Sequence, residues 1–295
     1  MKINSAFLYT SAAAIIWGGT APVMKLTLAE IPVFSLAFLR MATASLILGL
    51  LIAKHLKVKR EHYRSFLLAA ITGVTLNLSF FFVGLKLTQA ILAAFLIASI
   101  PVFTMIAAHV YLKEKFTQKL IGATVIAFLG VIIIIGKLEG KLQTLELIGN
   151  LLLLASTLSW VANEIVSKKL LKFYDGSVVA FYTMAIGATT FFPLFIWEYL
   201  KNPAWISGVT TQGAFGLLYG IFFASLAAYW AWNKGLSLQP AGQAAFFFYL
   251  DPISGAILAM ILLGEKLTPS LIVGGILIAA GVFLAENNRK NHPLI

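Results

Sequence analysis

Long stretches without any charged side chain are the feature that most constrains how this chain can fold. Reading from each Asp, Glu, Lys or Arg to the next gives eleven such stretches along 295 residues. An α-helix needs about 20 residues to cross the hydrocarbon core of a bilayer, and several of the stretches reach that length. The two short stretches on either side of Asp251 are best read as one helix that a single acid interrupts. The sequence therefore predicts an all-α polytopic membrane protein with ten transmembrane helices.

The predicted transmembrane spans follow from these stretches and their nearest polar ends. They run over roughly 6–26, 33–54, 65–85, 88–112, 119–136, 147–169, 177–199, 211–233, 241–263 and 268–285. Composition excludes a soluble fold: 60% of the residues are hydrophobic and 11% are charged, whereas soluble domains have about 45–50% and about 25%. A chain of this length cannot bury so much apolar surface within itself, so lipid must cover the rest.

The Lys and Arg residues are divided unequally between the two sides of the predicted bundle. With the N-terminus in the cytoplasm, fifteen of them fall in cytoplasmic segments and six fall outside, and Arg40 lies inside a span. The positive-inside rule then places both termini in the cytoplasm. The net charge of +11 is explained by this topology. We therefore expect no nucleic-acid partner, which would need the basic residues gathered on one face.

The second half of the chain repeats the first. At an offset of 151 residues, 18 of the 48 positions from 84 to 131 are identical. The aligned pairs include Pro101 with Pro252, Glu114 with Glu265 and, at an offset of 143, Trp17 with Trp160 and Lys25 with Lys168. We therefore divide the chain into two five-helix repeats, residues 1–140 and 141–295. Because five is an odd number, the second repeat is inverted in the membrane, an arrangement typical of transporters with alternating access to a midplane site.

Several motifs resemble those of a known family. They are Trp17-Gly18-Gly19, Arg40, Pro101, Glu114-Lys115-Phe116-Thr117, Pro252 and Leu263-Gly264-Glu265-Lys266-Leu267-Thr268. In these residues the chain resembles the EamA-type members of the drug/metabolite transporter superfamily. The resemblance implies a ten-helix carrier of the bacterial or archaeal inner (plasma) membrane, a central cavity lined mainly by helices 1, 3, 4, 6, 8 and 9, and export of amino acids, metabolites or drugs. The first copy departs from the family's Leu-Gly-Glu form, since it reads Leu112-Lys113-Glu114.

Asp251 is the acid predicted to lie nearest the bilayer midplane. It is ~15 Å into the ninth span at the ~1.5 Å rise per helical residue. A carboxylate at that depth costs at least about 2.5 kcal/mol on insertion scales, so it must face protein or water. Two interpretations stay open: a group that binds a proton or a substrate ammonium, and a structural acid beside the kink at Pro252.

The other candidates are aromatic, amide or charged side chains within the spans. The complete set of substrate-binding candidates is Trp17, Asn77, Phe81, Trp160, Asn163, Glu164, Tyr229, Gln243, Phe246 and Asp251. Trp17 and Trp160 are the best aromatic candidates, because the repeat relates them and small residues flank both. An aromatic cavity with one buried acid suits a zwitterionic or cationic solute with an apolar body, since ring faces attract ammonium groups.

Charged residues near the span ends have two interpretations each. Lys25 and Lys168 lie at opposite ends of the two repeats, where they either snorkel to the headgroups or, with Asp251, act as gating or coupling residues. Glu164 precedes Lys168 by one helical turn, a spacing that favours an interfacial ion pair, although a role in the cavity stays open. Arg40 is expected ~10 Å from the outer surface, where it would snorkel or hold an outer loop.

Together these features predict a secondary-type transporter, most simply an exporter of amino acids or small amphipathic metabolites or drugs that works by alternating access. Its predicted partners are the lipid bilayer and a small-molecule substrate; proton coupling and the choice between a monomer and a weak homodimer stay open. We expect no enzymatic activity, no cofactor and no metal site. Three alternatives remain: a membrane-embedded lipid-modifying enzyme, a nucleotide-sugar or phosphate carrier of the same superfamily, and a passive channel.

Overall fold

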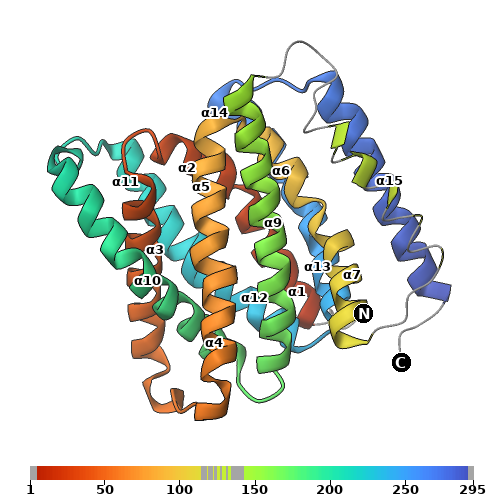
Figure 1. Ribbon diagram of the computed structural model, residues 1–295, viewed down its shortest axis with the longest axis horizontal. Helices are drawn as coiled ribbons and strands as arrows, with labels where there is room; N and C mark the ends of the chain where they lie inside the picture. Colours follow the sequence, from red (N-terminus) through yellow and green to blue (C-terminus); the bar gives the residue numbers. More distant parts are fainter. Residues whose placement is uncertain are drawn as a thin grey trace.

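The computed structural model describes residues 5–113 and 143–291, together with scattered positions between 118 and 133. In these residues every long regular element is a helix (Figure 1). The first repeat contains α1 (Ser5–Gly18), α2 (Thr20–Thr27), α3 (Val33–Leu51), η1 (Ala53–His55), η2 (Arg60–His62), α4 (Tyr63–Ala70), η3 (Ile71–Leu76), α5 (Asn77–Leu87), α6 (Ala90–Ile97) and α7 (Ile100–Leu112). The second contains α9 (Thr144–Leu170), α10 (Gly176–Lys201), η4 (Pro203–Trp205), α11 (Thr211–Leu218), η5 (Tyr219–Ala227), α12 (Ala228–Ser237), α13 (Ala241–Ala245), η6 (Phe246–Tyr249), α14 (Leu250–Leu263) and α15 (Pro269–Asn291).

The predicted spans agree with these elements. Seven helical runs among the described residues are long and apolar enough to cross a membrane, and two shorter apolar helices, Phe247–Leu263 and Pro269–Gly281, lie where the ninth and tenth spans were predicted. The predicted fifth span, 119–136, falls mostly outside the described residues. Many large apolar side chains are exposed, among them Leu50, Leu51 and Ile261, each by more than two-thirds. Such a surface is stable in lipid and not in water, which confirms the all-α polytopic membrane fold.

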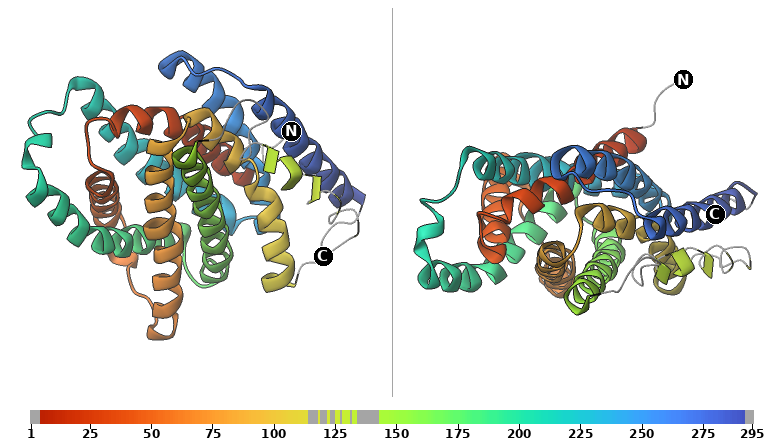
Figure 2. Two further views of the ribbon diagram at one scale, coloured as in Figure 1. Left: turned by 45° about the horizontal axis from the view of Figure 1, so that its top comes forward. Right: turned by 90° about the horizontal axis from the view of Figure 1, so that it is seen from above.

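The contacts between helices follow the inverted repeat. The third span of each repeat packs against the first span of the other repeat. Helix α5 contacts α9, and its equivalent α12 contacts α1. The pair α3 and α10 joins equivalent helices of the two repeats, whereas the repeat-related contacts of α6 with α14 and of α13 with α7 join opposite halves of the fourth and ninth spans. Figures 1 and 2 show α10 and α11 at one edge of the bundle and α15 at the other, with α1, α5, α9 and α14 between them.

Two equivalent spans contain a stretch of π-helix. In the third span it is η3, Ile71–Leu76, and in the eighth it is η5, Tyr219–Ala227. At the 151-residue offset η3 falls on residues 222–227, inside η5, so the two repeats carry this irregularity at the same place. A π-helical stretch widens the helix and redirects backbone carbonyls, and such stretches are common at functional sites.

The first span is broken where it meets the ninth. Helix α1 ends at Gly18, α2 begins at Thr20, and both contact α14. A Cβ at Gly18 would lie 1.8 Å from the hydroxyl oxygen of Ser254 and 3.0 Å from the carbonyl oxygen of Asp251, so only glycine lets α1 approach α14 this closely. The motif Trp17-Gly18-Gly19 therefore serves to bring the first span against the segment that carries Asp251.

One end of the bundle is fastened by Glu265, just after α14. Its carboxylate accepts hydrogen bonds from the backbone N–H groups of Ala90 (2.9 Å) and Ile91 (2.7 Å), the first residues of α6. It also forms an ion pair with Lys25 (3.2 Å), whose ammonium donates to the Thr88 carbonyl at 2.5 Å. The first N–H groups of a helix lack hydrogen-bond partners within that helix, and Glu265 supplies partners for two of them in α6. Through these bonds and the ion pair with Lys25, Glu265 joins the ends of the first, fourth and ninth spans. We call this cluster the Lys25 end.

The opposite end, where α1 begins, contains an equivalent fastening. Lys168 donates hydrogen bonds to the carbonyls of Leu236 and Gln239, both at 2.7 Å. Gln239 is the counterpart of Thr88 at the 151-residue offset, so the two repeat-related lysines bind equivalent carbonyls at opposite ends of the bundle. We call this the Lys168 end. The paired contacts are direct structural evidence that the repeats are inverted.

Asp175 adds a surface contact at the Lys168 end. It caps the start of α10 by accepting a hydrogen bond from the Ser177 N–H (2.9 Å), and it pairs with Lys234 at 2.8 Å. Burial alone would raise the pKa of Asp175, but the hydrogen bonds from Lys234 and Ser177 outweigh it and hold the pKa below its ordinary value. This contact is therefore present at neutral pH and is lost as the pH falls through that lowered pKa.

The first prediction concerns the Lys25 end. Glu265→Gln removes the negative charge that faces two helix N–H groups and an ammonium, and we expect it to lower the free energy of unfolding by about 1–3 kcal/mol. Thermal unfolding of the purified protein in detergent measures the effect. The control is Glu61→Gln, because Glu61 pairs with Lys59 at 3.6 Å on the surface and both side chains are more than 60% exposed. Equal melting temperatures for the two variants would contradict the fastening role.

The second prediction concerns the inversion and the orientation of the bundle. The chain contains no cysteine, and the side chains of Lys172 and Lys266 are exposed at the Lys168 end and the Lys25 end, respectively. We expect Lys172→Cys to react with an impermeant maleimide only after the cytoplasmic face of the membrane is opened. Lys266→Cys should react in intact cells, with the unsubstituted chain as the unreactive control. Labelling of both from one face would contradict the inverted arrangement.

Candidate substrate cavity

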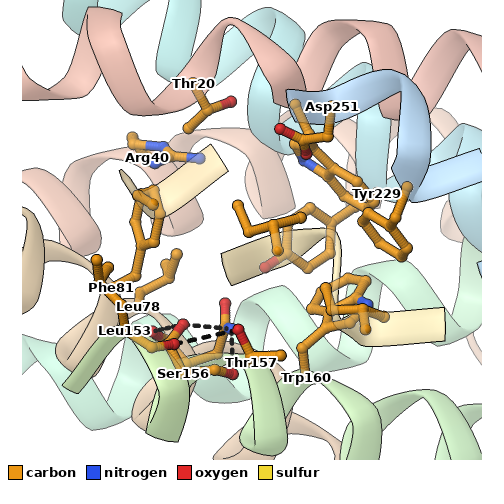
Figure 3. A pocket seen from close by; sticks show the side chains of 16 residues that line it. Thr20, Arg40, Leu78, Phe81, Leu153, Ser156, Thr157, Trp160, Tyr229 and Asp251 are labelled. Carbon is orange, nitrogen blue, oxygen red and sulfur yellow. Dashed lines mark hydrogen bonds between the residues drawn. The ribbon is translucent and has the colours of Figure 1, made fainter. Parts of the chain in front are cut away.

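A cavity of about 80 Å³ lies at the junction of the two repeats (Figure 3). Its lining residues come from seven of the spans. They are Trp17, Thr20, Arg40, Asn77, Leu78, Phe81, Ala93, Ile97, Ile100, Leu153, Ser156, Thr157, Trp160, Tyr229, Phe248 and Asp251. The helices involved are the six that the family resemblance implies, together with the second span, which contributes Arg40.

The cavity is small for a substrate site. Water occupies about 30 Å³ per molecule in the liquid, so 80 Å³ corresponds to the space of two or three waters. Sites for small organic ligands usually measure about 300–1,000 Å³. With the Lys25 end and the Lys168 end fastened, the cavity is too small for such a ligand, and helices must move apart to admit one; we call this arrangement closed in that sense.

Arg40 lies in the cavity wall and not near the outer surface. Its side chain is 1% exposed, which corrects the expectation that it snorkels or holds an outer loop. Its Nε donates to the carbonyl of Gly220 (3.3 Å) and to the hydroxyl of Ser225 (3.2 Å), both on η5. The guanidinium carbon lies 5.4 Å from the centre of the Phe82 ring. A Cβ at Gly220 would be 2.8 Å from Cδ of Arg40, so this glycine makes room for the arginine.

Asp251 also lies in the cavity wall, at the start of α14. Its side chain is 1% exposed, and its Oδ2 atom has no hydrogen-bond partner. Figure 3 shows Arg40 and Asp251 along the same side of the cavity, with Thr20 between them in this view. The equivalent of Asp251 in the first repeat is Ile100, which also lines the cavity. The acid is therefore an asymmetric feature of a nearly symmetric site.

An amide and a hydroxyl form the facing wall. Asn77 donates through Nδ2 to the carbonyl and the hydroxyl of Ser156, at 3.0 and 2.9 Å. The Ser156 hydroxyl donates in return to the backbone carbonyl of Asn77 at 3.0 Å. This reciprocal pair joins α5 to α9 and satisfies the polar groups that hydrocarbon cannot. The Oδ1 atom of Asn77 is not used in the pair.

Aromatic rings form the remaining wall, and Trp17 is central to them. Trp17 is stacked on Phe248 with 5.8 Å between ring centres, and it meets Trp160 edge-on at 5.0 Å and Tyr229 edge-on at 5.6 Å. Its indole N–H donates to the Ala224 carbonyl of η5 at 2.9 Å. Trp160 is buried, and its own indole N–H has no partner. The repeat-related tryptophans thus meet at the cavity, where one offers an unused donor.

The other sequence candidates lie elsewhere or outside the description. Asn163 and Glu164 are buried on α9 but are not among the lining residues; Glu164 accepts a hydrogen bond from Thr104 at 2.8 Å. Glu164 is completely buried in the protein, and its pairing with Lys168 stays a prediction. Lys25 and Lys168 lie at the two fastened ends. The side chains of Gln243 and Phe246 lie outside the described residues.

Sequence reasoning missed Thr20, Ser156 and Thr157 as lining residues and misplaced Arg40. Threonine and serine are common within membrane helices, so residue type alone gave no signal for the first three. A signal for Arg40 did exist, since a charged residue inside a span faces protein or water by default. Among the described residues, no group of three or more His, Asp or Glu side chains is placed to hold a metal ion.

Comparison with known proteins agrees with this architecture. The model of the EamA-like transporter family matches residues 4–136 and 147–286. An uncharacterized transporter of Archaeoglobus fulgidus is 29% identical over 98% of this chain and 99% of its own. The uncharacterized transporter YyaM of Bacillus subtilis is 25% identical over 97% of this chain and 95% of its own.

Two further similarities are more limited. A probable amino-acid metabolite efflux pump of Salmonella typhimurium is 27% identical over 53% of this chain and 54% of its own. One solved crystal structure superimposes with a TM-score of 0.71 over 98% of both chains at 18% sequence identity, a likeness of fold alone. The two matched segments cover nearly the whole chain, and the helices and cavity fit a polytopic carrier. The chain therefore belongs to the EamA-like transporter family and is a multi-pass membrane transporter.

Proposed function

We propose that the protein is a secondary exporter of amino acids or small amphipathic metabolites, located in the plasma membrane with both termini in the cytoplasm. The observation that carries the proposal is the closed cavity between two equivalent fastenings. Releasing the Lys25 end would open the cavity to one side, and releasing the Lys168 end would open it to the other. Exchange of conformation between the repeats would then give alternating access.

Lys25 and Lys168 act as the gating residues in this proposal. Each lysine binds carbonyl oxygens where one hairpin turns between two spans, and these contacts are hydrogen bonds at the rim of the bundle. Such bonds contribute only about 0.5–3 kcal/mol each.

The composition of the cavity wall supports an amphipathic, uncharged or zwitterionic solute. Among the described lining residues there is one cation, Arg40, and one acid, Asp251, beside several aromatic rings. A phosphate or nucleotide-sugar carrier would need an excess of positive charge at the site. The name of the Salmonella typhimurium relative, a probable amino-acid metabolite efflux pump, agrees with export of this solute class.

A membrane-embedded enzyme is a poorer explanation of the same residues. The polar residues near the inner face that would serve such an enzyme, Asn163, Glu164, Lys168 and His109, do not line the cavity. Glu164 is hydrogen-bonded to Thr104, and Lys168 holds two backbone carbonyls. Transport by reconstituted protein tests the choice directly: proteoliposomes loaded with unlabelled amino acids should accumulate labelled amino acid by exchange. Absence of exchange with every amino acid and amphipathic amine tested would overturn the proposed function.

The third prediction concerns the aromatic wall. Trp17→Ala removes a ring that contacts three other rings of the wall, and we expect it to weaken substrate binding by about 1–3 kcal/mol. The matched control is Trp197→Ala, because Trp197 is 54% exposed and does not line the cavity. Exchange kinetics in proteoliposomes give the affinity, and size-exclusion profiles give the folded yield. If Trp17→Ala folds poorly yet keeps its affinity, the ring serves packing only.

The fourth prediction concerns coupling to protons. Asp251 is a buried acid with a free oxygen, so binding of a proton and binding of a substrate ammonium at this group exclude each other. We expect Asp251→Asn to keep downhill exchange at saturating substrate concentration and to lose accumulation driven by an imposed pH gradient. The control Glu164→Gln removes another completely buried acid that lies outside the cavity wall. Concentrative transport by Asp251→Asn under a pH gradient would show that coupling resides elsewhere.

A further inference from the structure

Two opposite charges line the cavity without neutralising each other. The guanidinium of Arg40 and the carboxylate of Asp251 are each 1% exposed. Within the part of the chain that the structure describes, these two side chains form no ion pair. Each also retains a buried atom without a hydrogen-bond partner, Nη1 of Arg40 and Oδ2 of Asp251. Buried charges are normally paired, because removing them from water is costly.

The two charges share one neighbourhood. Both interact electrostatically with the phenol of Tyr219, whose hydroxyl donates to the carbonyl of Ile16. Both side chains line the cavity, with Thr20 between them in the view of Figure 3. A ligand in the cavity would therefore face both a cation and an acid.

Arg40 is held in place by its Nε and not by its terminal nitrogens. The bonds from Nε to Gly220 and Ser225 fix the plane of the guanidinium against η5. A purely structural arginine would place its full set of donors on protein acceptors, since the guanidinium carries five N–H groups. Here the unpartnered Nη1 belongs to a group in the wall of the cavity. Guanidinium groups bind carboxylates through paired hydrogen bonds from these same terminal nitrogens.

We propose that Arg40 binds the carboxylate of the substrate while Asp251 binds its ammonium group, so that the cavity selects zwitterionic α-amino acids over the corresponding amines and acids. This inference rests on the proposed function, because it specifies the solute of the same cavity. A zwitterion adds no net charge to the site. Its carboxylate and its ammonium would give Arg40 and Asp251 the partners of opposite charge that they lack. The aromatic wall around Trp17 then contacts the apolar side chain of the amino acid.

The aromatic wall also sets the order of the groups in the site. Asp251 and Trp17 come from spans that pack closely through Gly18, so the ammonium site adjoins the rings. Ring faces attract ammonium groups and repel carboxylates. The carboxylate site lies at Arg40 on α3, which faces η5. The opposite charges of Arg40 and Asp251 thereby fix which end of the zwitterion lies at which span.

The experiment uses purified protein in lipid nanodiscs and three matched probes: phenylalanine, phenethylamine, which lacks the carboxylate, and 3-phenylpropionate, which lacks the ammonium. The aliphatic set of leucine, isoamylamine and 4-methylpentanoate repeats the comparison with a different side chain. Equilibrium binding is measured by calorimetry. We expect the unsubstituted protein to bind at least one of the two amino acids about tenfold or more tightly than its amine and its acid.

The variants separate the two contacts. Arg40→Gln should weaken binding of the amino acid about tenfold or more and should not weaken binding of the amine. Asp251→Asn should weaken binding of the amino acid equally and should not weaken binding of the acid. Glu164→Gln, the buried acid outside the cavity wall, should change none of the three. Equal losses for all three probes in Arg40→Gln would overturn the inference and make Arg40 a structural residue.

Failure of the variant to fold leaves the inference testable, because the unsubstituted protein alone decides it. Amines bound as tightly as amino acids by that protein would overturn the carboxylate site at Arg40. Transport in proteoliposomes distinguishes this result from failure of the proposed function. If amino acids are exchanged but the probes are not discriminated, the exporter stands and the two-point site falls. If the probes are discriminated but none is transported, the site stands and the exporter falls.

Discussion

Backbone groups in hydrocarbon must be satisfied by protein, and the cavity of this transporter depends on how its irregular helices meet that requirement. The π-helical segments η3 and η5 present carbonyls that side chains from other spans bind. Tyr229 donates to Gly73 of η3 at 3.1 Å, and Trp17 donates to Ala224 of η5 at 2.9 Å. Gly73 and Ala224 are equivalent positions of the two repeats. The same side chains then form the cavity wall, so the helix irregularity and the site stabilise each other.

Under the proposed mechanism, near-symmetry gives the bundle two ways to open, and the departures from symmetry define the substrate site. The two lysines bind equivalent carbonyls at the two ends, and the described contacts of the Lys25 end also include the ion pair with Glu265. The charges are not equivalent, since the counterpart of Asp251 is Ile100. A symmetric pair of acids in so small a space would repel each other and require a cation or two protons. One acid and one arginine leave the empty cavity close to neutral, which allows the bundle to close without solute.

Closure without solute has a cost in this design. When Arg40 and Asp251 are buried they lose hydrogen bonds to water, and the protein does not replace all of them. Buried charged groups of this kind destabilise the state that buries them. An open arrangement would return them to water, and a zwitterion bound as proposed would pair them. Under that proposal substrate would favour a state that encloses it over the open ones, which is the differential affinity that a transported ligand needs to change the population of conformations.

The sequence by itself determined the membrane fold, the span positions and the inverted repeat, because each depends on length, charge spacing and internal identity that are local or additive along the chain. It also identified Trp17, Trp160 and Asp251 as residues of the interior, since polar and repeat-related groups inside spans have few alternatives. Only the tertiary structure decided where the side chains of Arg40 and Glu164 lie. The position of a residue along a helix does not reveal which neighbouring residues its side chain contacts. A long side chain can reach water or the protein interior from the same backbone position. Packing of η5 against α3 resolved this for Arg40, as packing of α7 against α9 did for Glu164.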